Sequence, residues 1–445
     1  MKILWLSTKA LSERDDGSTG TWLQAMAQKL IGQEQIELGN IAEDQVKDLR
    51  RQDYGAIQQW IVPRSLSLGR PGLLPPKSAV AVRELIERFT PDLIQVWGTE
   101  NHWGLFTART PLSVPVLLEM QGLRGAISRV FHGGLSFREQ LACIGPKELI
   151  LGASIRKSRE YFRAWSSVDQ EIISRHHFIA SHSDWMVAQV RAVNSAARIF
   201  RTERLLRKQF YEGSCWRCSG RPVIFCSAAY PSPFKGLHVA VRSLAILKEH
   251  FPNIQMRIAG AHQRPGFHQE GYIAWIEREI HRLRIESNIV WLGALSAGRI
   301  VEELSNCSAF VLPTFVESYC VALAEAMVLG VPTVVSFNGG TSYLAKDNET
   351  ALFFPPGDEA MCAYQLERLL VRPELSEQIS SRARATALQR HDPYKVTHRQ
   401  MEIYQSVLAE VHDNDRKAGH VLADSESSGA AFQAVRMDSN TPYCF

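Results

Sequence analysis

Short apolar runs alternate with segments of helical periodicity along most of this chain, and this alternation is the strongest constraint on its fold. Strands that are apolar on both faces are typical of parallel sheets covered by helices. Leu237, Val241 and Leu244 show the spacing of one helix face between two such runs. The pattern predicts an α/β fold with parallel sheets. The expected strands are Ile3–Ser7, Leu93–Trp97, Val114–Met120, Phe178–Ser181, Val223–Ser227, Gln255–Ala259, Ile289–Leu292, Ala309–Pro313 and Pro332–Ser336.

The length of the chain, 445 residues, exceeds what one compact core usually holds, so two domains are expected. A small, polar stretch with glycine and proline lies just before the strand that begins at Val223. We therefore expect a first Rossmann-like domain over 1–213 and a second over 221–395. A helix over 396–411 should return toward the first domain. The remainder, 412–445, lacks periodicity and is expected to be a disordered tail.

Charge and cysteine usage exclude several classes of protein. The net charge of +4 is too small to indicate nucleic-acid binding. The cysteines are scattered apart from Cys215 and Cys218, which argues against a disulfide framework and fits a reducing cytoplasm. That pair lacks the further ligands of a structural zinc site. The most apolar stretch, 308–335, contains two glutamates and two prolines, so no membrane-spanning helix is expected there.

The most informative motif is Glu317-Ser-Tyr-Cys-Val-Ala-Leu-Ala-Glu325, which follows an expected strand. With a helix starting near Ser318, the free N–H groups of Ser318, Tyr319 and Cys320 could bind an anionic diphosphate. One carboxylate could then hold sugar hydroxyls and the other ribose hydroxyls. The alternative is a helix cap and a satisfied polar residue. Because the apolar helix would bury Glu325, which then needs a partner, we favour the functional interpretation.

Two loops carry further candidates. Lys235 lies in the loop between the strand Val223–Ser227 and the next helix, where α/β folds bind ligands. Its ammonium group suits a phosphate, although a surface lysine in a turn is the alternative. After the first strand, Gly17 and Gly20 would allow close approach of a ligand to the backbone. That loop lacks the third glycine of a dinucleotide-binding fingerprint, so a dehydrogenase fits poorly.

Together these segments resemble the family-4 glycosyltransferases of GT-B architecture, in the bacterial branch that builds cell-surface polysaccharides. The resemblance extends over roughly residues 1–407. In the second half it rests on Phe234-Lys235-Gly236, Trp291-Leu-Gly293, the glutamate motif with Ala326-Met327, Gly330-Val-Pro332 and Asn338-Gly339-Gly340. In the first half it rests on Pro91–Glu100, Met120-Gln-Gly122, Ser183-Asp184-Trp185, Thr202–Arg207 and Phe210-Tyr211.

The resemblance implies two Rossmann-like domains facing a cleft, and retaining transfer of a hexosyl unit from a nucleotide-sugar. The donor would be a UDP-sugar, with a GDP-sugar as the alternative, and the acceptor a glycan or a lipid-linked molecule. No metal and no other cofactor is implied. Glu317 would contact the hexose, Glu325 the ribose, and Lys235 the diphosphate. The donor-binding residues implied are Gly17, Gly20, Lys235, Gly293, Glu317, Ser318, Tyr319, Cys320 and Glu325.

Two departures from the family pattern keep a second function open. No arginine precedes Lys235, where the chain has Ala228-Ala-Tyr-Pro. Trp97 stands where many members place a histidine, which leaves Glu100 and His102 as the nearest candidates for catalysis. For His102 a loop histidine without a role is the alternative. The second function is a degraded homologue that serves as a binding or scaffold subunit, although both motif glutamates are retained.

The segment 123–165 combines basic and apolar side chains. Such a surface can rest on anionic lipid headgroups, which would place a cytoplasmic protein peripherally at the inner membrane face. A solvated helical face is the alternative. The sequence leaves the oligomeric state open.

Overall fold

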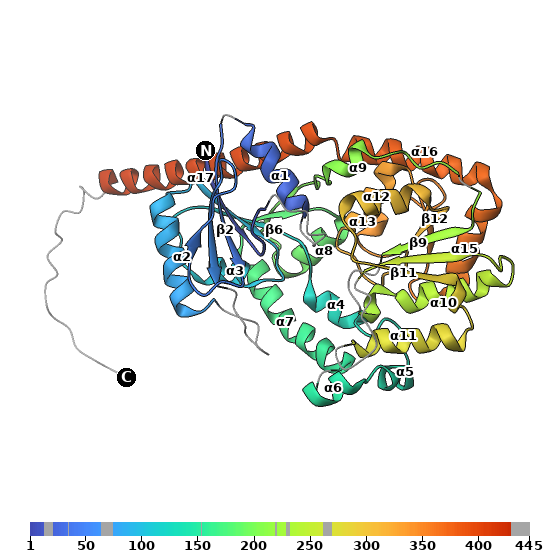
Figure 1. The fold of residues 1–445 in the computed structure, drawn as a ribbon. Coiled ribbons are helices and arrows are strands. Elements are labelled where there is room, and N and C mark those ends of the chain that lie inside the picture. Colours follow the sequence, from blue (N-terminus) through green and yellow to red (C-terminus); the bar gives the residue numbers. More distant parts are fainter. Residues whose placement is uncertain are drawn as a thin grey trace, which may run out of the picture.

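The computed structural model describes residues 1–12, 21–33, 35–63, 74–152, 154–218, 220–227, 232–260 and 269–428. Two α/β domains lie side by side (Figure 1). The first sheet has the strand order β3-β4-β2-β1-β5-β6-β7-β8, and the second has the order β11-β10-β9-β12-β13-β14. Within the described chain every strand pair is parallel except β3 with β4. The predicted α/β fold with two parallel sheets is confirmed.

The first domain contains strands β1 to β8, with helices on both faces of the sheet. Its strands are β1 Lys2–Ser7, β2 Glu37–Asp44, β3 Arg50–Arg51, β4 Gln58–Pro63, β5 Leu93–Trp97, β6 Val116–Glu119, β7 Phe178–Ser181 and β8 Arg198–Arg201. Its helices are α1 Thr21–Ile31, α2 Pro76–Phe89, α3 His102–Arg109, α4 Arg124–Val130, α5 Phe137–Ala142, α6 Pro146–Leu151, α7 Ile155–Arg175 and α8 Asp184–Val193. The short helix α9, Lys208–Glu212, lies in the connection to the second domain.

The second domain repeats the strand–helix alternation. Its strands are β9 Val223–Ser227, β10 Gln255–Ala259, β11 Ile289–Gly293, β12 Ala309–Leu312, β13 Thr333–Ser336 and β14 Leu352–Phe354. Its helices are α10 Leu237–Lys248, α11 Gly271–Arg282, α12 Ala297–Asn306, α13 Val321–Leu329, α14 Thr341–Leu344, α15 Glu359–Val371 and α16 Pro373–Arg390. Two 3₁₀ turns, Pro233–Lys235 and Glu286–Asn288, precede α10 and β11.

Strands β2 and β4 are not predicted from the sequence, because polar side chains interrupt their apolar pattern. Asn40 and Gln59 are fully buried in these two strands. The Asn40 amide donates to Gln59 Oε1 at 2.9 Å, and Ser7 Oγ donates to Asn40 Oδ1 at 3.0 Å. These side chains satisfy one another, so the sheet tolerates them in its interior.

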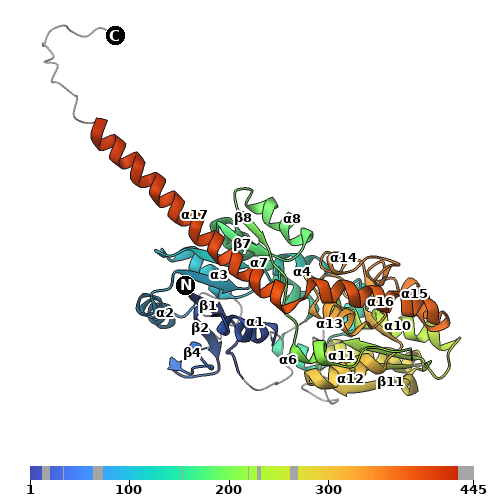
Figure 2. The same ribbon diagram turned by 90° about the horizontal axis from the view of Figure 1, so that it is seen from above.

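The last helix, α17, connects the two domains. It spans Pro393–Ser428 and passes along the first domain, where it approaches α1 and β1 (Figures 1 and 2). The helix is longer than the 396–411 expected from the sequence. The stretch after Val411 therefore continues the helix to Ser428, where we expected a tail. It contains no proline and several good helix formers, such as Arg416, Lys417 and Ala418.

Helices α5 and α6 belong to the first domain by sequence but pack against the second. Leu135 and Cys143 are buried in the same apolar cluster as residues of α10 and α11. Arg242 of α10 pairs with Glu139, and the N–H of Gly271 donates to Glu148 Oε1 at 2.9 Å. We call residues 131–152 the arm. It ties the first domain to the outer helices of the second.

The contact between α17 and the first domain generates a prediction. The Trp5 indole donates to the Tyr404 hydroxyl at 3.1 Å, and that hydroxyl donates to Gln95 Oε1. Tyr404→Phe would leave buried polar groups without this partner, so we expect a loss of about 1–3 kcal/mol in the free energy of unfolding. Urea denaturation measures it. Tyr394→Phe on the same helix is the control, because Tyr394 is 78% exposed. Equal stability of the two variants would contradict the packing described.

Candidate active site

Residues that follow the carboxyl ends of strands in both domains meet one another. Ser183, which follows β7, donates from Oγ to the carbonyl oxygen of Ser318 at 3.1 Å. Trp185 packs directly on Gly339, which follows β13, and a Cβ on that glycine would collide with the indole ring. Ligands of open parallel sheets bind at this edge of the strands. The candidate site therefore lies between the two domains.

Lys235 and Glu317, predicted from separate motifs, are in contact. Lys235 Nζ lies 2.7 Å from Glu317 Oε1. The lysine side chain is 30% exposed and the glutamate side chain 16% exposed. Gly236, the residue after Lys235, has φ 74°, and a Cβ there would collide with the carbonyl oxygen of Pro313. Only glycine therefore fits where the turn that carries Lys235 packs against the strand end before Glu317. The structure thus brings together a cation and a carboxylate that remain accessible from solvent.

The backbone around Glu317 is held by the loop after β13. The N–H of Gly340 donates to the carbonyl oxygen of Glu317 at 2.7 Å. The helix that follows begins at Val321, so the prediction of a start near Ser318 is wrong. The reason is Cys320, whose left-handed backbone (φ 76°) precedes the first turn. The amides of Ser318, Tyr319 and Cys320 therefore lie in the turn before α13.

Glu325 is buried in α13, as expected, and its partner is an arginine from the connection between the domains. Arg207 Nε lies 2.7 Å from Glu325 Oε1, and Arg207 Nη2 lies 2.8 Å from Oε2. Burial raises the pKa of the Glu325 carboxyl, and the adjacent guanidinium opposes that rise. Because Arg207 engages both oxygens, Glu325 is a satisfied ion pair in this structure. A ribose contact for it stays a prediction.

The other predicted donor residues differ in what surrounds them. Gly293 ends β11 with φ 68°, and among the described residues no atom beyond its chain neighbours lies within 4 Å of the position of a Cβ. Its carbonyl oxygen accepts from the N–H of Gly260 at 2.8 Å. Gly17 and Gly20 lie outside the described residues.

Glu100 and His102 contact different partners. Glu100 Oε2 accepts from the N–H of Gly122 at 3.0 Å, so it lies at the carboxyl edge between β5 and β6. His102 is buried, and its Nε2 lies against the carboxylate of Glu43 at the end of β2. This contact makes His102 part of the buried packing of the first domain. His102 and Glu100 therefore do not share a partner.

Arg204 is a further candidate residue that no local motif singles out, although it lies within a segment that carries the family resemblance. Arg204 is buried with its guanidinium 3.8 Å from the ring centre of Trp22, the second residue of α1. Burial lowers its pKa, whereas Glu119, Tyr319 and Glu100 raise it. Its Nη1 has no hydrogen-bond partner in the described part of the chain. Arg204 therefore supplies a further positive charge at the domain interface, beside those of Lys235 and Arg207.

Within the described residues, no group of three histidine, cysteine or carboxylate side chains lies close enough to hold a metal ion. In the same part of the chain no helix is long and apolar enough to cross a membrane.

Comparisons with known proteins show which family model and which curated proteins this chain resembles. Residues 218–386, within the second domain, match the family model "Glycosyl transferases group 1". A putative colanic acid biosynthesis glycosyltransferase, WcaL from Salmonella typhimurium, is 23% identical over 304 residues, 65% of this chain and 67% of that protein. Alignments with other curated glycosyltransferases cover 36% to 47% of those proteins' length. The predicted glycosyltransferase domain is confirmed.

Solved structures confirm the predicted GT-B fold. Sucrose-phosphate synthase from Thermosynechococcus elongatus has a TM-score of 0.69 at 15% identity, over 92% of this chain and 99% of that chain. Anabaena HepE in complex with UDP and glucose has a TM-score of 0.60 at 16% identity, over 91% of this chain and 100% of that chain.

The buried pair at Glu325 predicts a large loss of stability when one partner is removed. Arg207→Met would leave the Glu325 carboxylate buried without its cation, and we expect a loss of about 3–5 kcal/mol. The double variant with Glu325→Met should recover much of that loss. Lys208→Met is the control, because Lys208 is exposed and its pair with Glu212 is too. Thermal unfolding compares the four proteins, and equal stability of Arg207→Met and Lys208→Met would contradict this account.

Asp169 of α7 predicts a pH dependence. Its Oδ2 accepts from the N–H of Gly125 at 2.8 Å, and burial, with a further contribution from Glu100, raises its pKa from 3.8 to about 7. Because its pKa is higher in the folded state than in the unfolded chain, the Asp169 carboxyl contributes stability that is complete below about pH 4 and is lost as the pH rises through 7. Asp169→Asn should abolish this loss, which amounts to at most about 4 kcal/mol. Urea unfolding from pH 4 to 8 measures it. Asp48→Asn, at an exposed position, should follow the wild type.

Proposed function

We propose that this protein is a retaining glycosyltransferase that moves a hexosyl unit from a nucleotide-sugar to a glycan or lipid-linked acceptor in cell-surface polysaccharide synthesis. The observation that carries the proposal is the contact of Lys235 with Glu317 at the edge where both sheets end. The matched domain, the named colanic acid relative and the structure of HepE with UDP and glucose support it. The UDP-linked donor is part of the proposal.

In this proposal Lys235 neutralises charge on the departing diphosphate. A cation positioned where negative charge develops lowers the barrier, because it need not reorganise during the reaction. Helix α13 begins at Val321, four residues after Glu317, and in this proposal its first amides and the positive end of its dipole also stabilise the diphosphate. With these groups we propose that transfer proceeds without a divalent metal.

Glu317 has two tasks in the same scheme. Before the donor arrives, its carboxylate holds Lys235 in place. Once a diphosphate takes over the lysine, the carboxylate is free to accept hydrogen bonds from hydroxyls of the hexose. In each state the lysine has an anionic partner and the carboxylate has hydrogen-bond donors, which avoids the cost of leaving a partly buried polar group without a partner.

The alternative is a degraded homologue that acts as a binding or scaffold subunit. It is favoured by the absence of a basic residue at 228–231, just before Lys235. Donor binding without turnover would support it.

The proposal predicts that nucleotide-sugars stabilise the protein. With a panel of UDP-, GDP- and ADP-sugars and no divalent metal, one nucleotide class at about 100 times its Kd should add about 2.7 kcal/mol, seen as a rise in Tm. Lys235→Ala should weaken this rise and lower turnover about 100-fold or more. Lys346→Ala is the control, because Lys346 is exposed in the same domain. No rise with any donor in folded wild-type protein would overturn the proposal.

A further inference from the structure

The proposed donor carries more negative charge than Lys235 alone can compensate. Both phosphates of a nucleotide-sugar are ionised, and Lys235 is also in contact with the carboxylate of Glu317. No basic residue stands at 228–231, directly before the turn that carries this lysine. We therefore expect a further cation to reach the diphosphate from another part of the chain.

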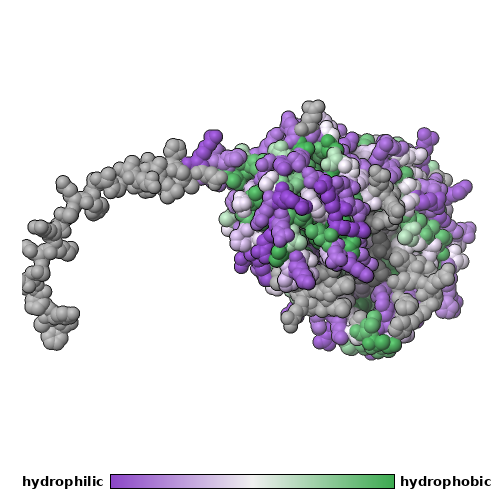
Figure 3. All heavy atoms as spheres, turned by 60° about the vertical axis from the view of Figure 1, so that its left-hand side comes forward, coloured by the Kyte–Doolittle hydropathy of each residue, from purple (hydrophilic) through white to green (hydrophobic). Residues whose placement is uncertain are grey.

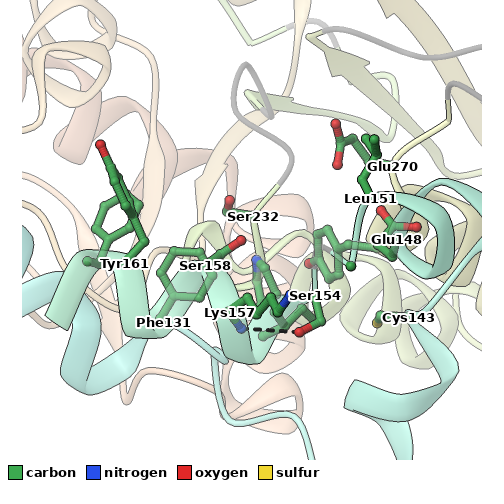
Figure 4. A pocket seen from close by; sticks show the side chains of 15 residues that line it. Phe131, Cys143, Glu148, Leu151, Ser154, Lys157, Ser158, Tyr161, Ser232 and Glu270 are labelled. Carbon is green, nitrogen blue, oxygen red and sulfur yellow. Dashed lines mark hydrogen bonds between the residues drawn. The ribbon is translucent and has the colours of Figure 1, made fainter. Parts of the chain in front are cut away.

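The arm packs beside the turn of Lys235, but its surface does not suit a diphosphate. In Figure 3 a hydrophobic patch forms the lower edge of the molecule, where Figure 1 places α6 of the arm. The pocket of about 530 Å³ between the arm and the second domain (Figure 4) sets the carboxylates of Glu148 and Glu270 against the ammonium group of Lys157. The charge around this pocket is therefore not positive on balance.

Arg204 has a buried guanidinium with an unused donor. The residue is 5% exposed. Among the described residues its Nη1 has no hydrogen-bond partner and its side chain forms no ion pair. Burial lowers the pKa of Arg204, but the carboxylates of Glu119 and Glu100 raise it and favour the charged form. A buried charged group is costly until its N–H groups find acceptors, so this side chain is suited to an anionic ligand.

The carboxylates around Arg204 are engaged with other donors. Glu119 Oε1 lies 2.8 Å from His182 Nε2. Glu203 Oε2 accepts from the Tyr319 hydroxyl at 2.8 Å. These carboxylates keep the guanidinium charged from a distance, and they leave its Nη1 to another acceptor.

Arg204 lies at the crevice of the first sheet. Strands β1 and β5 are neighbours, but β1 continues through α1 to β2 on one side, and β5 continues through α3 to β6 on the other. Open parallel sheets bind ligands at such a reversal of strand order. Trp97 ends β5, and Trp22 of α1 packs on it with ring centres 5.2 Å apart. The guanidinium of Arg204, 3.8 Å from the ring centre of Trp22, therefore lies beside the first turn of α1.

Arg204 also approaches the turn that carries Glu317. Its guanidinium lies 5.7 Å from the ring centre of Tyr319, two residues after Glu317. Lys235 contacts Glu317 in the same turn. The segment 317–320 therefore has one cation from each domain beside it.

We propose that Arg204 binds the diphosphate of the nucleotide-sugar and supplies the cation that the loop before Lys235 lacks. The inference deepens the proposed function and rests on it. The planar guanidinium donates parallel hydrogen bonds to phosphate oxygens, and the first amides of α1 favour the same anion. The diphosphate then joins Arg204 of the first domain to Lys235 of the second. Both cations stabilise the charge that develops on the leaving group during transfer.

Titration calorimetry with UDP, without divalent metal, tests the inference. Arg204→Met should weaken UDP binding at least about 10-fold, because a charge-assisted hydrogen bond is lost. Uridine, which has no phosphate, should bind both proteins alike. Arg198→Met is the matched control. Arg198 also lies over an aromatic ring, that of Phe200 at 5.5 Å, but its side chain is 60% exposed at the first residue of β8.

The Tm of the unliganded protein separates a binding role from a structural one. Because a buried charge with an unused donor is costly, Arg204→Met should leave this Tm unchanged or raise it. Arg204→Lys keeps a charge but lacks the planar fork, so it should also weaken UDP binding, and it carries the test if Arg204→Met does not fold. Unchanged UDP affinity in the folded variants would overturn the inference, whatever their Tm.

Two further outcomes distinguish the source of the phosphate and the level at which the proposal fails. If Arg204→Met binds UDP like the wild type but loses affinity for inorganic phosphate, Arg204 serves a phosphate other than that of the donor, and the inference is wrong. If UDP binds wild type and Arg204→Met equally, the inference fails and the proposed function stands. If UDP does not bind the wild type, the proposed UDP-sugar donor fails and the inference fails with it.

Discussion

The arrangement of the site depends on the buried ion pair between Arg207 and Glu325. Arg207 ends the segment that leaves the first domain, and Glu325 lies in the middle of α13. A buried carboxylate is costly unless it is paired, so the pair fixes where the connecting segment crosses the helix. Glu317 precedes the same helix. The position of the proposed donor contact is thus set from the domain connection, and not by the second domain alone.

Further buried contacts also join the connecting segment to the second domain. The Tyr319 hydroxyl donates to Glu203 at 2.8 Å, and Tyr343 donates to the same carboxylate. His391, between α16 and α17, donates from Nδ1 to the carbonyl oxygen of Arg204 at 2.9 Å. Burial lowers the pKa of His391 to about 4, which favours its neutral form. The two chain crossings between the domains therefore meet at one polar cluster, which also adjoins the turn before α13.

Much of the fold could be predicted from the sequence, because continuous apolar strands such as Phe178–Ser181 show their burial directly. Strands β2 and β4 could not, since their buried Asn40 and Gln59 satisfy each other only after the sheet has formed. The full extent of α17 could not be predicted either, because the sequence after Val411 lacks an apolar period. Local sequence patterns thus predict strands that are buried on both faces. They do not predict strands whose buried polar side chains find their hydrogen-bond partners on another strand, or a helix that rests on propensity alone.

The candidate site, like the fold, could be predicted from the sequence only in part. Lys235 and Glu317 could be found because each lies in a local motif at the end of an apolar strand, and parallel sheets gather such ends at one edge. The partner of Glu325 could not, because 118 residues separate it from Arg207 along the chain. Arg204 is missed for the same reason, since its ring partner Trp22 is brought to it only by the fold. A motif therefore places a charged side chain at the carboxyl edge of a sheet. Whether that charge is paired depends on the assembled domains. In this chain the pairing with Arg207 decides whether Glu325 is free to bind a donor.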